Sequence, residues 1–205
     1  MNALQHRKYL WIFIFHLAVL VPLTACAKSP APASNVRPPN YINQEFGFSL
    51  QRPESWTAGP SPAPNARVKL ATPANTQRAE CVVIVKRYPN AISAKQSDID
   101  QVFLEAPSAA ELKEILSQSA HEVEILAASS GNLDTRPAHL ARVRYTVGAP
   151  PETTYVTGRV VMTATPGLTW TMSCGGQGNT AAEADKSFQY WQREINSIVS
   201  SFKFK

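Results

Sequence analysis

Apolar residues recur along this chain at two spacings, and each spacing predicts a different element. Every second residue from 46 to 50 is apolar, which is typical of a half-buried strand, and Pro53 ends that strand. Further strands are predicted at 67–73 and 79–88, and the second is rich enough in β-branched residues to be buried on both faces. Four more strands are expected between residues 121 and 174, so strands dominate the pattern.

Apolar residues at three- and four-residue spacing predict two helices. Ser108 and Glu111 form a capping box, in which each side chain accepts a hydrogen bond from a backbone N–H of the other residue, and a helix follows. Thr180 and Glu183 form a second box before a long C-terminal helix. The apolar stripe of this long helix predicts that it packs on the sheet. The members of the stripe are Phe188, Trp191, Ile195, Val199 and Phe202.

The first apolar run has the features of a secretory signal. Residues 10–23 are apolar apart from the interruptions at His16 and Pro22, and they follow a short segment that carries Arg7 and Lys8. A transmembrane helix needs about 20 apolar residues, and this run is shorter. We therefore expect residues 1–25 to be a signal peptide that is removed.

The sequence "LTAC", which ends at Cys26, resembles the lipobox of bacterial lipoproteins. The resemblance implies cleavage before Cys26 and attachment of a diacylglyceryl group to its thiol sulfur, so that the lipid bilayer holds the protein. Several acyl chains hold a protein on a membrane more firmly than one chain does. The alternative is an ordinary secretory signal in which Cys26 has no such role.

A proline-rich stretch follows the lipobox. Residues 26–40 contain four prolines and almost no large apolar side chain, which is typical of an extended, semi-rigid tether. Ala27 lacks the aspartate that retains many lipoproteins in the inner membrane, whereas Lys28 and Ser29 resemble another retention signal. We expect a domain outside the cytoplasm, in the periplasm, with the outer membrane slightly favoured over the inner.

Charge and length limit the classes of protein. Without Arg7 and Lys8 the chain has 18 Lys and Arg against 15 Asp and Glu, a surplus of only +3. A surplus this small, without a basic cluster, does not indicate nucleic-acid binding. The length suits one domain with a sizeable core, which we expect to comprise residues 41–205.

The order of elements resembles the PsbP-like fold, which also occurs in a nuclear Ran-binding protein and in bacterial envelope lipoproteins. The resemblance rests on "FGFSLQRPESW" at residues 46–56, two middle helical segments, a run of antiparallel strands, and a closing helix that ends in "SIVSSFKF". It implies an α+β fold, an α/β/α sandwich around a central antiparallel sheet with a long C-terminal helix. The matched residues are packing residues, so the resemblance implies no activity.

No arrangement of residues predicts catalysis, a metal or a cofactor. His121 precedes Glu122 and Glu124, but successive side chains of a strand alternate between faces, so His121 is expected to point away from both. No serine lies in a nucleophile elbow. The glycine-rich "CGGQGNT", residues 174–180, lacks the lysine of a phosphate-binding loop and is interpreted as a flexible turn before the last helix.

Two sets of residues remain as candidate sites. Arg142 and Arg144 share one face of a predicted strand, and Arg159 on a neighbouring strand could join them in a patch for an acidic partner; a solvated strand face is the alternative. Cys81 and Cys174 are the pair left once Cys26 is lipidated, and an oxidising compartment favours a disulfide between them. Two separate buried thiols are the alternative.

These observations favour a non-enzymatic, membrane-anchored module that binds or supports another protein of the cell envelope. The alternative is an envelope enzyme, or a small-ligand-binding lipoprotein, whose site forms at the edge of the sheet from residues distant in sequence.

Overall fold

Two antiparallel sheets form the framework of residues 40–205, the part of the chain that this computed structural model describes. The larger sheet has the strand order β3-β4-β5-β9-β8-β7-β6. Its strands are β3 (Thr57–Gly59), β4 (Ala66–Ala71), β5 (Ala79–Arg87), β6 (His121–Leu133), β7 (Arg136–Val147), β8 (Thr154–Thr165) and β9 (Leu168–Gly178). The smaller sheet has β2 (Phe48–Gln51) between β1 (Asn40–Asn43) and β10 (Lys203–Phe204).

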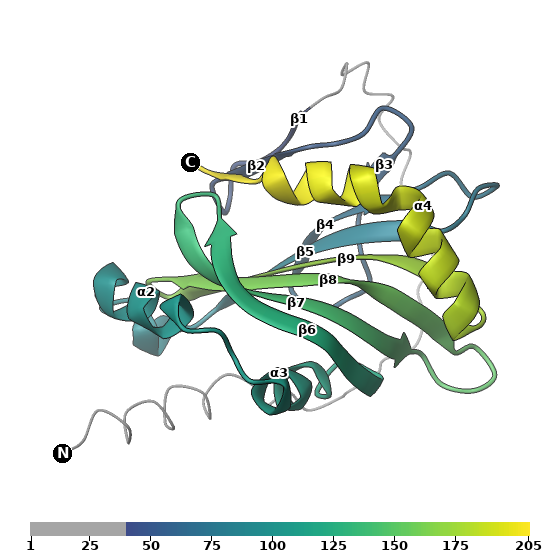
Figure 1. Cartoon of the computed structure of the whole chain (residues 1–205). Coiled ribbons are helices and arrows are strands. Elements are labelled where there is room, and N and C mark those ends of the chain that lie inside the picture. Colours follow the sequence, from purple (N-terminus) through teal and green to yellow (C-terminus); the bar gives the residue numbers. More distant parts are fainter. Residues whose placement is uncertain (1–39) are drawn as a thin grey trace, which may run out of the picture. The chain divides into compact units, whose positions relative to one another are not determined.

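Helices cover both faces of the larger sheet (Figure 1). The long helix α4 (Ala181–Ser200) packs on one face, mainly over β9 and β8. On the other face α2 (Gln96–Leu104) packs on β7 and β8, and α3 (Ala109–Leu116) packs on β6. A short 3-10 helix, Pro89–Ala91, follows β5. The expected α/β/α sandwich with a long C-terminal helix is confirmed.

Both helix starts that the sequence predicts are present. The Ser108 hydroxyl accepts from the Glu111 N–H, and the Glu111 carboxylate accepts from the Ser108 N–H, which completes the capping box of α3. At α4 the Thr180 hydroxyl accepts from the Glu183 N–H, but the Glu183 carboxylate accepts from the N–H of Asn179, one residue earlier. Backbone N–H groups that lack a partner within the helix are thus satisfied at the N-terminal ends of both α3 and α4.

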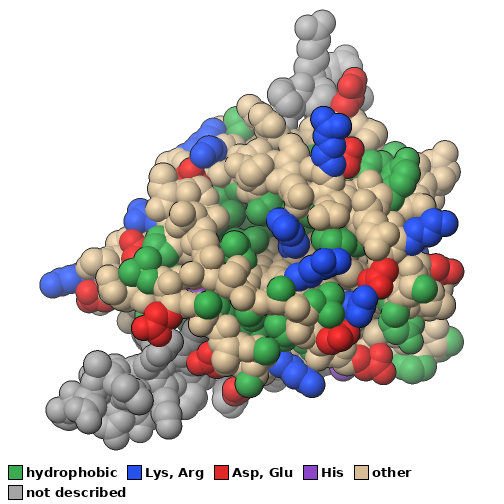
Figure 2. Space-filling view, in the orientation of Figure 1, with side chains coloured by type: hydrophobic (Ala, Val, Ile, Leu, Met, Phe, Trp, Pro, Cys, Tyr) green, Lys and Arg blue, Asp and Glu red, His purple; other side chains and the backbone are tan. Residues whose placement is uncertain are grey.

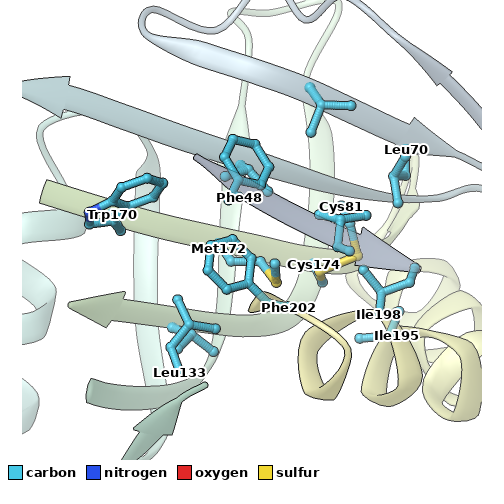
Figure 3. Packing of buried hydrophobic residues seen from close by; sticks show 14 of the residues in the cluster. Phe48, Leu70, Cys81, Leu133, Trp170, Met172, Cys174, Ile195, Ile198 and Phe202 are labelled. Carbon is cyan, nitrogen blue, oxygen red and sulfur yellow. A yellow bond between two sulfur atoms is a disulfide. The ribbon is translucent and has the colours of Figure 1, made fainter. Parts of the chain in front are cut away.

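The main core lies between the larger sheet, α4 and the smaller sheet (Figure 3). Phe48 of β2 stacks on Phe202 at a centroid distance of 5.5 Å and meets the edge of Trp170 of β9 at 5.9 Å. Ile195 and Ile198 of α4 are also fully buried. The prediction that α4 packs on the sheet through an apolar stripe is confirmed, but Ile198 rather than Val199 is the fully buried residue near its C-terminus, and Phe202 lies beyond the end of the helix.

Strand β5 is buried on both faces only over part of its length. Cys81, Val83 and Val85 face the core and are buried; on the other face Val82 is buried, whereas Ile84 is partly exposed. The reason is that α2 and α3 cover β6, β7 and β8 and do not reach β5.

Cys81 of β5 and Cys174 of β9 form a disulfide. The two residues are directly opposite in the register of the two strands, and their Cα atoms are 4.0 Å apart. Both side chains are buried in the main core. The predicted pairing is therefore present in the fold, and the alternative of two separate thiols is not.

The interpretation of "CGGQGNT" as a flexible turn is wrong. Strand β9 continues through these glycines to Gly178, and only two residues separate it from α4. A Cβ atom at Gly176 would lie 2.1 Å from the backbone nitrogen of Phe188, so the glycine allows α4 to approach the sheet closely. Close packing, rather than chain flexibility, accounts for the glycines.

Several predictions lie outside the described residues. The signal peptide at 1–25, the lipid attachment at Cys26 and almost all of the tether at 26–40 belong to this group. Within residues 40–205, no helix is long and apolar enough to span a bilayer.

Candidate functional site

A groove lies beside α4, where this helix leaves part of the sheet uncovered. Its floor comes from β6, β7 and β8, and its wall comes from the C-terminal half of α4, with a volume of about 930 Å³. We call it the α4 groove. Figure 2 shows a hollow near the middle of this face, with hydrophobic side chains inside it and Lys or Arg side chains beside it.

The groove exists because α4 packs over β9 and β8 and does not cover the outer strands of the sheet. Alternation along the strands turns Ala127 of β6, Leu140 of β7 and Val161 of β8 toward this face. These three side chains form an apolar part of the floor, and Ala127 at its outer strand is small.

Two arginines lie directly opposite each other on the floor of the groove. Arg142 of β7 and Arg159 of β8 are register partners, and both are exposed and line the groove. Neither forms an ion pair with any residue from 40 to 205. The guanidinium carbon of Arg142 lies 5.5 Å from the centroid of the Phe188 ring, which orients it at the foot of α4. We call Arg142 and Arg159 the arginine pair.

Arg144, which the sequence placed in the same patch, makes a different contact. Its Nε and Nη2 donate to the two carboxylate oxygens of Asp185 on α4, at 3.1 and 2.7 Å, and its Nη1 donates to Glu124 at 3.3 Å. The Thr157 hydroxyl also donates to Asp185, at 2.7 Å. Arg144 does not line the α4 groove, and it joins β7 to α4 instead.

The charges around Asp185 shift the pKa values of both partners. The hydrogen bond from Arg144 has the largest effect and lowers the pKa of Asp185 below its usual value. Burial, the next largest effect, raises this pKa, and the hydrogen bond from Thr157 and the positive charges of Arg144 and Arg142 lower it further. The same hydrogen bond to Asp185, together with that to Glu124, raises the pKa of Arg144. This ion pair is a structural contact between helix and sheet.

Two further cations line the groove that the sequence analysis did not select. Arg193 lies on the exposed side of α4, and Lys203 begins β10. Lys203 donates to Asp134 at 2.7 Å, and this hydrogen bond lowers the pKa of Asp134, the only acidic residue among those lining the groove. The charge of Lys203 is thus compensated. The arrangement of α4 over the sheet, which brings Arg193 near the arginine pair, has no local sequence signal.

Polar side chains line the rest of the groove. They are Ser129 and Asn132 from β6 and Asn196, Ser197 and Ser200 from α4. The side-chain oxygen of Asn196 is buried and accepts no hydrogen bond from residues 40–205. A buried acceptor without a donor costs free energy, which a ligand that donates to it would recover.

The histidines do not form a metal site within residues 40–205, where no three His, Cys, Asp or Glu side chains are grouped to hold an ion. The register of β6 shifts between His121 and Glu124, and Glu122 has a positive φ of 49°, so the regular alternation that the sequence analysis assumed is interrupted here. Glu124 contacts Arg144. His139 is buried under α2 against the Phe103 ring, at a centroid distance of 4.7 Å.

No protein-family model matches this sequence, and no curated protein matches it significantly. The fold is similar to that of the cyanobacterial PsbP of Synechocystis sp. PCC 6803, with a TM-score of 0.52 and 16% identity over 87% of this chain and 98% of that one. It is also similar to LpqN, a protein involved in cell envelope biogenesis of Mycobacterium tuberculosis, with a TM-score of 0.46 and 12% identity over 81% of this chain and 89% of that one. The chain has the PsbP-like fold.

Proposed function

We propose that this protein is a membrane-anchored lipoprotein of the bacterial cell envelope, whose PsbP-like domain binds another envelope protein in the α4 groove without catalysing a reaction. The observation that carries the proposal is the groove itself, in which Arg142, Arg159 and Arg193 form no ion pair within residues 40–205. Cations without an ion-pair partner beside apolar side chains indicate a surface that is completed by a partner.

The chemistry of the groove supports a binding role over a catalytic one. Asp134, the acidic residue in its lining, is paired with Lys203 and hydrogen-bonded to the Phe204 N–H. A general base needs a group that can accept a proton near neutral pH, and the low pKa of Asp134 does not suit that role. A substrate assay in which the purified protein turns over a compound would contradict this part of the proposal.

Anchoring through Cys26 rests on the order of the basic start, the apolar run and "LTAC". We expect Cys26→Ser to move the protein from the detergent phase to the aqueous phase in a phase-partitioning experiment. We also expect mass spectrometry of the wild type to show an acylated N-terminal peptide that begins at residue 26. A wild-type protein without lipid would contradict the anchoring.

Site-directed photocrosslinking in intact cells tests the binding site. Ser129 and Ser130 are neighbouring exposed residues of β6, and Ser129 lines the α4 groove whereas Ser130 lies on the opposite face of the strand. We expect a photoreactive residue at position 129 to give a crosslinked envelope protein and the same residue at position 130 to give none. Equal adducts from both positions, or no adduct from position 129, would contradict binding in this groove.

A further inference from the structure

We propose that the α4 groove binds an extended acidic segment of a partner protein, with a carboxylate held between Arg142 and Arg159. This inference rests on the proposed function and adds the chemistry of the partner. It follows from the arginine pair, the position of Arg193, and the polar lining of the groove.

The arginine pair is costly to the free protein. Directly opposite residues of antiparallel strands have Cβ atoms about 4.5–5.5 Å apart, and like charges at that spacing are destabilising. Neither arginine forms an ion pair with an acidic residue from 40 to 205; Asp185 pairs with the nearby Arg144, and Arg142 interacts with its carboxylate only at longer range. Guanidinium groups bind carboxylates through two parallel hydrogen bonds, so a carboxylate of the partner would supply the missing opposite charge.

Arg193 extends the positive charge to the other side of the groove. It comes from α4, whereas the arginine pair comes from the sheet, so three cations from three elements line one groove. Asp134 is the only acidic residue in the lining, and it is paired with Lys203. The charge of the groove therefore complements a segment with more than one acidic side chain.

The polar lining favours a peptide over a lipid. The buried side-chain oxygen of Asn196 needs a donor, and the N–H groups of a peptide backbone can donate to it whereas an acyl chain cannot. Asn132 and Ser129 line the β6 side of the groove and offer further hydrogen bonds. From Ala127 to Asn132 this side measures about 17 Å at strand rise, the length of about five extended residues.

The test measures binding of a labelled acidic peptide to the purified full chain by fluorescence anisotropy. The probe is a peptide of about ten alternating Glu and Ser residues, which spans up to about 35 Å when extended, and its control has Gln in place of Glu. We expect the Glu peptide to bind more tightly than the Gln peptide. We expect Arg142→Gln with Arg159→Gln to weaken binding by at least about tenfold, because two charge-assisted contacts are lost.

The matched control variant is Lys113→Gln with Lys186→Gln, which removes the same charge from exposed positions outside the groove. We expect it to retain nearly all of the affinity. If both double variants lost the same affinity for the Glu peptide, the effect would be one of nonspecific charge and the proposal would be overturned. Equal binding of the Glu and Gln peptides to the wild type would overturn it as well. Circular dichroism of each variant shows whether it is folded.

Two competitors distinguish the acidic segment from other sources of negative charge. They are inorganic phosphate and the soluble short-chain lipid dihexanoylphosphatidylglycerol. We expect neither to displace the Glu peptide at concentrations where unlabelled peptide does. Displacement by the lipid as effective as by the peptide would overturn the proposal in favour of a lipid site. The two proposals can also be distinguished in cells. If the crosslink from position 129 persists in the Arg142→Gln, Arg159→Gln variant, binding of an acidic segment is overturned, but the proposed function remains intact.

Discussion

Arg144 of β7 donates hydrogen bonds to both carboxylate oxygens of Asp185 on α4. This two-point contact attaches the N-terminal part of α4 to β7, whereas the helix packs mainly over β9 and β8. The same contact removes Arg144 from the set of cations that could meet a partner. Of three arginines that share one face of the sheet, one therefore positions the helix and two remain for the groove.

Asp185→Asn should lower the stability of the fold at neutral pH, because Arg144 loses a charged partner and Thr157 loses the carboxylate to which it donates. We expect a lower midpoint of urea unfolding at pH 7 than in the wild type. Glu54→Gln, at an exposed turn position outside the helices and strands, is the control and should leave the midpoint nearly unchanged. An unchanged midpoint for Asp185→Asn would contradict the role of this contact.

The pH dependence of stability follows from the same carboxylate. The pKa of Asp185 is lowered in the folded state, so its contribution is present above the unfolded pKa of about 3.9 and is lost as the pH falls through the folded pKa. We expect the difference in unfolding midpoint between wild type and Asp185→Asn to shrink steadily when the pH is lowered from 5 toward 2. A difference that stays constant over this range would contradict the assignment.

Gly176→Ala should displace α4, because the added Cβ would lie 2.1 Å from the Phe188 nitrogen and backbone atoms cannot move aside easily. Overpacking of this kind costs about 1–3 kcal/mol of unfolding free energy. Gly59→Ala is the matched control, since nothing lies within 4 Å of its Cβ position. Equal stability of the two variants in thermal unfolding would show that close approach of α4 does not require the glycine.

Removal of the disulfide should destabilise the fold. The two cysteines are 93 positions apart, and in the chain-entropy model closing a loop of about 100 residues contributes about 4–5 kcal/mol. We expect Cys81→Ala with Cys174→Ala to unfold at lower urea concentration than the oxidised wild type. Reduced wild type should behave like the double variant, and a non-reducing peptide map that finds both thiols free would contradict the bond.

Arg159→Glu should separate stability from binding. The new carboxylate faces Arg142 and replaces a like-charge pair with an opposite-charge pair, which contributes about 0.2–1 kcal/mol in cross-strand pairs. We expect a variant that is at least as stable as wild type and has lost its affinity for the acidic peptide. Loss of stability would mean that the arginine pair has a structural role.

The elements of this fold are visible in its sequence because their signals are local. Capping residues mark the starts of α3 and α4, and apolar alternation marks several of the strands. The pairing of Cys81 with Cys174 was predicted differently, because these two cysteines remain once Cys26 is assigned to the lipid and an oxidising compartment favours a disulfide. The glycines before α4 were wrongly predicted to form a flexible turn. Their role depends on the close approach of α4, and the local sequence does not show this contact. The groove could not be predicted, since Arg193 and the arginine pair meet only through the angle at which α4 crosses the sheet.

The disulfide also divides the chain into a segment inside a covalent loop and segments outside it. It closes a covalent ring from Cys81 to Cys174 that contains β6, β7 and β8, and with them the floor of the α4 groove. Helix α4 begins after Cys174 and lies outside this ring, so noncovalent contacts such as Arg144 with Asp185 hold it there. If α4 were detached, the groove would lose one wall, whereas the disulfide would still connect the two ends of the segment that forms its floor.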